Sequence, residues 1–359
     1  MRSARSNEVW IVGATGRTGR ALAPRLAAHA DAKVVLVGRS VAGLHAAATA
    51  LGPGVRVVAL DGMSAIIDAV RNERPRVVVN LVGTYSQTAL ELARACMPNG
   101  AYIDLANDLD SMQALLALHD EAEQNGSTLI TGAGFGVLGT EAVVARLCAD
   151  RPVPHSVRVD ALGSFASENG VMGDAFAQTS VDVITTGGRQ FRDGRLVPVR
   201  LASNVQHLTL PDGSTVTSAA VPSGELLAAQ RASGAANVDF TSALAPTAPA
   251  VRALLPLMTR VLKLPSARRI MVKQLAASRT HAAPRPRVHS WGHAIVTWPD
   301  GTVREGWLRA GDAMEFTADA LAAVSTAILS GTAPNGAFTP AAAFGAQIAV
   351  IAGGTFIDR

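Results

Sequence analysis

Short apolar runs alternate with longer helical patterns through the first third of the chain. Between the runs, segments with apolar residues on one face predict helices. Successive parallel strands need crossover helices between them, so this alternation predicts an α/β fold with a doubly wound parallel sheet of the Rossmann type. The runs that predict buried strands lie at residues 8–13, 33–38, 55–60, 76–83, 102–105 and 128–131.

A glycine-rich loop follows the first predicted strand and opens the first predicted helix. Residues 13–19 read GATGRTG. Glycines at this junction permit a tight turn and a close approach of the backbone to a pyrophosphate, whose charge the helix N-terminus stabilises. The alternative is a tight turn without a ligand, but the strand and helix around the loop favour dinucleotide binding. The candidate residues are Gly13, Thr15, Gly16, Arg17, Thr18 and Gly19.

The end of the second strand indicates which dinucleotide binds. An acidic residue there would bind the ribose 2′-hydroxyl of NAD. Gly38 is instead followed by Arg39 and Ser40, whose guanidinium and hydroxyl suit a 2′-phosphate. The sequence therefore predicts NADP, although Arg39 could also be an ordinary solvated arginine. Asp61, after the third strand, is a candidate for the adenine edge or a turn residue.

Composition narrows the class of protein. The net charge is +4, but the basic residues are scattered and aromatics make up only 4%, so nucleic-acid binding is not expected. Two cysteines cannot build a disulfide framework, which favours a cytoplasmic setting. No uncharged stretch is long enough to span a membrane. No cluster of histidine, cysteine or acidic residues has the spacing of metal ligands, so we expect no metal.

The pattern changes after Asp150, where RPVPH interrupts the periodic segments. Beyond it, alternating runs and two Pro-Asp-Gly turns, at residues 211–213 and 299–301, predict an inserted α+β domain with a mixed or antiparallel sheet. We expect a Rossmann domain over residues 1–150, a substrate or dimerisation domain over 151–334, and a C-terminal segment, 335–359, that packs back on the first domain. An exposed sheet face in the second domain would suit a homodimer.

Four segments together resemble saccharopine dehydrogenase-like oxidoreductases. They are GATGRTGR at residues 13–20, VVVNLVGTY at 77–85, AYIDLANDLD at 101–110 and LITGAGFGVLGTEAVVARL at 129–147. VPSGELLAAQRASGAANVDF at 221–240 resembles the substrate-domain segment of the family. GAFTPAAAFG at 336–345 resembles its trans-acting enoyl reductase branch.

The resemblance implies an NADP-binding Rossmann domain, a substrate domain and a cleft between them. Val82 and Gly83 would lie beside the nicotinamide, and Phe135 would contact the substrate. Tyr85 and Asp104 become candidates for proton transfer or substrate orientation. Tyr85 could instead pack against the cofactor, and Asp104 could anchor its loop or cap a helix. The sequence departs from the family at Gly136, where an aspartate is often found, and near Gly134, where a cysteine often precedes the Gly-Phe pair.

These observations predict an NADPH-dependent reductase that transfers hydride to a polarised C=N bond, or to a C=C bond conjugated to a carbonyl, in a small metabolite. The alternative is a non-catalytic NADP-binding sensor or accessory protein, which the missing polar residues around Gly134 and Gly136 would suit.

Two basic features lie in the second half of the chain. Arg231 could hold a substrate carboxylate, or could be a surface arginine. Basic residues also punctuate an apolar helical region over residues 250–273. That region could lie on a membrane surface or an acidic partner, but the pattern favours an amphipathic helix that covers the core and has a solvated basic face. Its basic residues are Arg252, Arg260, Lys263, Arg268, Arg269 and Lys273.

Overall fold

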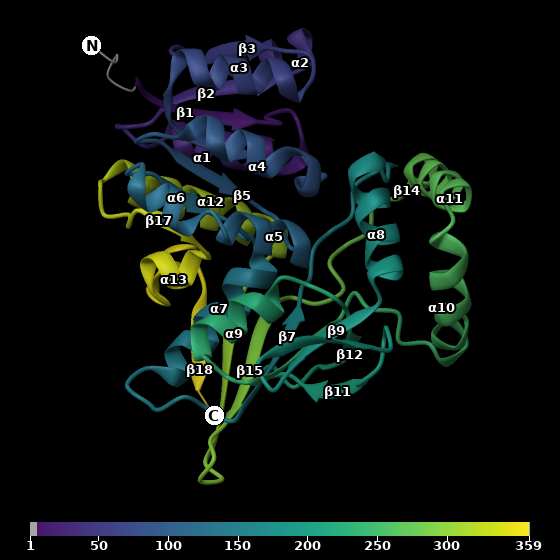
Figure 1. Cartoon of the computed structure of the whole chain (residues 1–359). Helices are drawn as coiled ribbons and strands as arrows, with labels where there is room; N and C mark the ends of the chain where they lie inside the picture. Colours follow the sequence, from purple (N-terminus) through teal and green to yellow (C-terminus); the bar gives the residue numbers. More distant parts are fainter. Residues whose placement is uncertain (1–5, 359) are drawn as a thin grey trace. The chain divides into compact units, whose positions relative to one another are not determined.

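The computed structural model describes residues 6–358, apart from the side chains of residues 174–176 (Figure 1). These residues form two compact units. The first comprises residues 6–106, 110–134 and 314–353, and the second comprises residues 107–109, 135–313 and 354–358. Each unit has its own sheet, and the second unit is inserted into the first along the sequence.

A seven-stranded parallel sheet forms the centre of the first unit, with strand order β17-β6-β5-β4-β1-β2-β3. The central strands β1 and β4 are buried on both faces, which explains their near-continuous apolar sequences. The order 3-2-1-4-5-6 is that of a Rossmann fold, so the predicted fold class is confirmed. The strands are β1 (Ser6–Val12), β2 (Lys33–Gly38), β3 (Arg56–Ala59), β4 (Pro75–Asn80), β5 (Ala101–Asp104), β6 (Thr128–Ile130) and β17 (Gly336–Phe338).

Helices connect these strands much as the sequence predicts. The helix expected between the fifth and sixth strands is divided in two, because His119 begins a new helix and its Nδ1 lies 3.2 Å from the backbone of Ala337 in β17. The helices are α1 (Arg17–Ala27), α2 (Val41–Leu51), α3 (Met63–Glu73), α4 (Tyr85–Cys96), α5 (Leu109–Leu116), α6 (His119–Gln124), α12 (Ala313–Leu329), α13 (Pro340–Phe344) and α14 (Gln347–Ile351).

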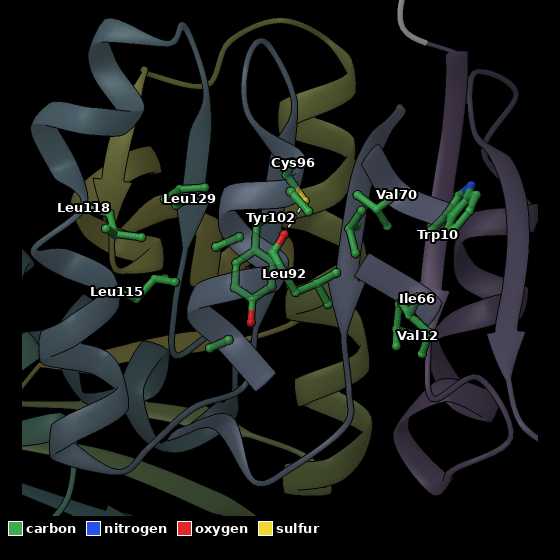
Figure 2. Close-up of a cluster of buried hydrophobic side chains, with 14 of the residues drawn as sticks. Trp10, Val12, Ile66, Val70, Leu92, Cys96, Tyr102, Leu115, Leu118 and Leu129 are labelled. Atoms are coloured by element: carbon green, nitrogen blue, oxygen red, sulfur yellow. Dashed lines mark hydrogen bonds between the residues drawn. The ribbon is translucent and has the colours of Figure 1, made fainter. Parts of the chain in front are cut away.

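The core of the first unit lies between its sheet and the helices that cover it. Figure 2 shows a cluster in which Trp10 and Val12 of β1 lie near Ile66 and Val70 of α3, and Tyr102 lies beside Leu92. Tyr102 is fully buried. Its hydroxyl therefore needs hydrogen-bond partners inside the protein, and these partners belong to the site described below.

A nine-stranded mixed sheet forms the second unit, with a main path of order β10-β9-β13-β7-β15-β16-β18, while β12 pairs with β13 and β11. Among the described strands of this sheet, β13 and β7 alone pair in parallel, and the other pairs are antiparallel. Both Pro-Asp-Gly turns form the predicted hairpins, β11–β12 and β15–β16. The strands are β7 (Ser156–Leu162), β9 (Gly188–Arg192), β10 (Arg195–Val199), β11 (Gln206–Thr209), β12 (Thr215–Ala220), β13 (Asn237–Ser242), β15 (Ser290–Thr297), β16 (Val303–Ala310) and β18 (Thr355–Asp358). Two short strands, β8 (Gly170–Val171) and β14 (Arg279–Thr280), form a separate ladder.

The boundaries of the units differ from the expected divisions at residues 150 and 334. The second unit begins at α7 (Phe135–Cys148), which packs so tightly on β15 that a side chain at Gly292 would overlap the carbonyl of Gly139. Within the C-terminal segment, β17 joins the first sheet whereas β18 pairs with β16 in the second. The other helices of the second unit are α8 (Asp174–Thr186), α9 (Glu225–Ser233), α10 (Pro249–Leu262) and α11 (Pro265–Ala277).

Candidate functional site

The glycine loop connects β1 to α1 at the carboxyl end of the first sheet. Gly13 has φ +87°, which favours glycine, and its N–H donates to the carbonyl of Val37 at 2.9 Å. The N–H of Gly16 donates to the carbonyl of Gly13 at 3.0 Å, which closes the turn just before the helix. Because β1 and β2 are neighbours, the hydrogen bond to Val37 also fixes the loop against the end of β2.

The loop has the features that a pyrophosphate requires. A Cβ at Gly19 would lie 2.6 Å from the carbonyl oxygens of Gly13 and Ala14, so only glycine fits there. Gly16 caps α1 without a side-chain hydrogen bond, and the first turn of α1 contains no acidic residue. The N–H groups of a first helical turn have no partner within the helix, and they stabilise a phosphate anion. These residues fit a bound dinucleotide.

Arg39 and Ser40 lie beside this loop, between β2 and α2. Ser40 caps α2, since its Oγ accepts a hydrogen bond from the N–H of Gly43 at 3.1 Å. A Cβ at Gly43 would lie 3.3 Å from Cγ2 of Thr15, so the start of α2 adjoins the glycine loop. Arg39 is exposed, and it forms no ion pair with any residue of the described part of the chain. Its guanidinium is therefore available to a phosphate.

Asp61 follows β3, the edge strand next to β2. It is exposed in a bend, and the preceding Leu60 donates its N–H to the carbonyl of Gly38 at 3.0 Å. This hydrogen bond holds the ends of β2 and β3 together. Asp61 therefore lies at the same sheet edge as Arg39, where its role toward the adenine stays a prediction.

Val82 and Gly83 follow β4 on the other side of β1. The N–H of Leu81 donates to the carbonyl of Val12 at 2.9 Å, and a Cβ at Gly13 would lie 3.1 Å from Cγ2 of Val82. The two loops meet where the strand order reverses between β1 and β4, the position at which ligands bind in sheets of this kind. The structure thus brings Val82 together with the glycine loop.

Tyr85 begins α4 directly after this loop. Its side chain is half-buried and packs against the apolar core cluster of the first unit. This position agrees with both predicted roles, packing and substrate contact.

Asp104 ends β5 and is completely buried. Its carboxylate accepts hydrogen bonds from the Tyr102 hydroxyl at 3.0 Å, the Thr131 hydroxyl at 2.8 Å and the N–H groups of Ala106 and Gly132. Burial raises the pKa of Asp104 to about 6, although these hydrogen bonds favour the charged form. So many internal partners favour the anchoring role over direct proton transfer.

A residue that the sequence analysis missed extends this network. Asn80, at the end of β4, donates to the Tyr102 hydroxyl at 3.0 Å and to Thr88 at 3.2 Å, and its Oδ1 accepts from the N–H of Val82 at 3.1 Å. Burial is also the main reason that the pKa of Tyr102 is raised. Asn80 therefore links the buried Asp104 network to the loop that carries Val82. The sequence signal that could have identified Asn80 is its position as a polar residue at the end of an apolar strand.

Phe135 and Arg231 belong to the second unit. Phe135 begins α7 and is buried, and its ring lies 3.4 Å from the position of a Cβ at Gly139. Arg231 is exposed in the last turn of α9. The substrate contacts expected for these two residues stay predictions.

The structure explains the glycine at position 136. A side chain there would collide with the carboxyl of Glu225, which is buried at the start of α9 and accepts a hydrogen bond from Ser223. Burial raises the pKa of Glu225. A carboxyl from α9 therefore fills the space beside residue 136, the position at which the resembling family often carries an aspartate.

One group of residues has the spacing of metal ligands, within the described part of the chain. Ligand atoms of His119, Asp120 and Glu123 lie within 4.8 Å of one another. The two carboxylates are exposed, and Nδ1 of His119 contacts the backbone of Ala337. The expectation that no such cluster exists is therefore wrong, although exposed acidic groups of this kind are common without an ion. Among residues 6–358, no helix combines the length and the apolarity needed to cross a bilayer.

Known proteins share both the sequence features of this site and the fold that carries it. Residues 9–130 match the model of the saccharopine dehydrogenase NADP-binding domain. Residues 9–130 therefore form an NADP-binding domain of the saccharopine dehydrogenase family. The match covers β1 through β6, and therefore includes both loops at the strand-order reversal. NADP is its cofactor, and the chain is an NADP-dependent oxidoreductase.

Solved structures extend the similarity to the second unit. Saccharopine dehydrogenase (L-Glu forming) from Saccharomyces cerevisiae aligns over 99% of both chains with a TM-score of 0.64 and 14% identity. At that identity the match shows a shared two-domain fold. Serine dehydrogenase from Escherichia coli aligns over 34% of this chain and 80% of its own, with 16% identity and a TM-score of 0.30. No curated protein matches the sequence.

Proposed function

We propose that this protein reduces a polarised C=N bond, or a C=C bond conjugated to a carbonyl, in a small metabolite. NADPH, when bound, supplies the hydride. One observation carries the proposal: the start of α2, which directly follows Arg39 and Ser40, adjoins the glycine loop at the carboxyl edge of a sheet whose strand order reverses beside it. The similarity of residues 336–345 to the trans-acting enoyl reductase branch supports the conjugated C=C substrate.

In the first unit, some residues would bind the cofactor and others position the loops around it. The glycine loop and the first turn of α1 would hold the pyrophosphate, and Arg39 with Ser40 would hold the 2′-phosphate. The buried network of Asn80, Tyr102 and Asp104 fixes the loops at the ends of β4 and β5. Rigid loops hold reacting groups in place, which favours transfer in a defined geometry.

Protonation of the reduced substrate needs a donor near the site. Tyr85 is the candidate from the first unit, because it follows directly on the Val82–Gly83 loop. A bound water is the alternative. Asp104 is less suited to this step, since its carboxylate is buried and accepts four internal hydrogen bonds.

The substrate is proposed to be a small molecule. The cytoplasm suits the two free cysteines, Cys96 and Cys148. A homodimer stays a prediction that light scattering can test.

A turnover assay tests the proposal. Consumption of NADPH is followed by absorbance over a panel of imines formed from amino acids and oxo acids, conjugated enoyl thioesters, and simple ketones. We expect turnover with one of the first two classes, and much slower turnover with NADH. Tight NADPH binding without consumption of any member would contradict a reductase and favour a non-catalytic sensor. Replacing Tyr85 by Phe then tests the donor: kcat should fall while the Kd for NADPH stays the same.

A further inference from the structure

The helices α10 and α11 of the second unit expose an apolar face where the sequence pattern favours a solvated basic one. Leu255 and Leu262 of α10 are buried against the unit. On the outer side, Leu254, Leu257, Val261 and Leu264 are 57%, 61%, 45% and 59% exposed. The spacing of three and four residues places Leu254, Leu257 and Val261 in one row along α10, and Leu264 follows at the junction with α11. The solvated face of α10 therefore carries aliphatic side chains in addition to the expected basic ones.

Basic residues flank this row. Arg260 and Lys263 lie at the end of α10, and Arg269 and Lys273 are exposed on α11 together with Ile270. None of these four cations forms an ion pair with the described residues. Arg268 differs, because its guanidinium pairs with Asp182 of α8 at 2.6 Å. The surface therefore combines exposed aliphatic side chains with uncompensated positive charge.

The surrounding sequence strengthens this charge. Between Asp239 and Asp300 there is no acidic residue, whereas in the rest of the chain acidic residues outnumber basic ones. The same stretch contains nine basic residues: Arg252, Arg260, Lys263, Arg268, Arg269, Lys273, Arg279, Arg285 and Arg287. An occupant of this surface must be anionic and must also accept aliphatic side chains.

We propose that the α10–α11 face binds the surface of an anionic lipid bilayer. Leu254, Leu257, Val261 and Leu264 would enter the boundary between headgroups and acyl chains, while the arginines and lysines contact lipid phosphates. Figure 1 shows α10 and α11 following one another along one side of the second unit, with α8 beside them. The inference does not depend on the proposed reaction.

Charge argues against the other occupants. A second copy of the chain would present the same positive face, and like charges would oppose the contact. Single-stranded nucleic acid needs aromatic platforms for its bases, and residues 241–289 contain no aromatic residue apart from histidines. An anionic bilayer satisfies the charge and the apolar row together.

Vesicle flotation tests the inference with the whole chain. We expect binding to phosphatidylcholine vesicles that contain phosphatidylglycerol, and little binding to phosphatidylcholine alone. Raising the salt concentration should weaken the binding, because exposed charges are screened. Substituting Leu254→Ser, Leu257→Ser and Val261→Ser together should abolish flotation.

A charge-reversal variant and matched controls complete the design. Each cation near an anionic surface contributes roughly fivefold in affinity, so Arg269→Glu with Lys273→Glu should weaken vesicle binding at least ~25-fold. Val171→Ser with Val303→Ser changes equally exposed valines elsewhere in the second unit and should bind like the wild type. All variants should keep the circular dichroism spectrum and the unfolding temperature of the wild type, which shows that they remain folded.

Three results would overturn the inference. The first is absence of flotation with anionic vesicles. The second is equal binding to neutral and anionic vesicles, which would show that the charge is irrelevant. The third is a wild-type dimer that the triple serine variant converts to a monomer, which would show that a second copy covers the face.

Discussion

Gly19 is the residue at which the glycine loop tolerates least change. A Cβ there would lie 2.6 Å from two backbone carbonyls, and neither can move without opening the turn after β1. Gly13 adds a positive φ, and Gly16 leaves the first turn of α1 without a side-chain cap. The loop sequence follows from these three requirements, which is why the sequence alone predicts the turn between β1 and α1.

Replacing Gly19 by Ala should therefore weaken both folding and cofactor binding. Overpacking against rigid backbone costs about 1–3 kcal/mol of unfolding free energy, and NADPH affinity should fall because the loop shifts. Urea denaturation and calorimetry measure the two effects. Gly311→Ala is the matched control, because its Cβ would meet no atom within 4 Å. Equal stability of the two variants would contradict the packing argument.

Asp104 makes stability depend on pH in an unusual direction. Its pKa is raised from 3.8 to about 6 in the folded state, so the folded protein retains a proton that the unfolded chain loses. The stabilising contribution is complete below pH 3.8 and is lost as the pH rises through 6. The full difference corresponds to roughly 3 kcal/mol.

Replacing Asp104 by Asn removes this dependence. Between about pH 4 and pH 7, the wild type should lose roughly 3 kcal/mol of unfolding free energy relative to the variant. Denaturant titrations at several pH values measure it. Asp120→Asn, at an exposed position, should follow the wild type throughout. If the unfolding free energies of Asp104→Asn and of the wild type changed equally with pH, the pKa of Asp104 would not be raised in the folded protein.

At the scale of elements, helices and strands of the first unit were largely predictable because their periods are clear. Each exception has an identifiable cause. The division of α5 from α6 depends on the contact of His119 with β17, more than 200 residues away in sequence. The β9–β10 hairpin was missed because charged and apolar residues do not alternate cleanly there.

The second sheet contains a buried histidine, His293, that no local sequence pattern predicted to be buried. His293 of β15 lies 2.7 Å from the carboxylate of Asp160 on β7 and 3.0 Å from Glu305 on β16. The ring also stacks on Trp307 at a centroid distance of 3.8 Å. Strand pairing brings these residues together: the register places His293 opposite both Asp160 and Trp307. Sequence alone could not supply that register.

Replacing His293 by Ala should destabilise the second unit strongly. Asp160 is fully buried, and removing one partner of a buried charge costs about 3–5 kcal/mol. Arg158, at 3.2 Å, compensates only partly. Thermal unfolding measures the loss. His155→Ala removes an exposed histidine and should have little effect. A loss equal to that of the control would show that the His293–Asp160 pair carries no stability.

At the scale of the molecule, the order of the two units could be predicted, but their boundaries could not. α7 is apolar on nearly every side, so its sequence does not reveal which sheet it covers. α12 lies in the first unit and β18 in the second. The chain therefore passes from the first unit back to the second near its C-terminus. Only packing settles such assignments.

Cofactor binding should therefore act on one unit first. At an NADPH concentration of one hundred times Kd, the first unit should gain about 2.7 kcal/mol. Differential scanning calorimetry should show its transition move upward while that of the second unit stays in place. At the same NADPH concentration, the Gly19→Ala variant should show a smaller movement, because its affinity is lower. An equal shift of both transitions would contradict separate cores.

The central claim is that Arg39 and the glycine loop together select NADP. Isothermal titration of both cofactors, into the wild type and Arg39→Glu, tests this most directly. The wild type should bind NADPH at least about tenfold more tightly than NADH, since a charge-assisted hydrogen bond contributes about 1.5–3 kcal/mol. The variant should lose NADPH affinity by about 10- to 100-fold and keep its NADH affinity. Absence of heat with either cofactor, or an unchanged preference in the variant, would contradict the account.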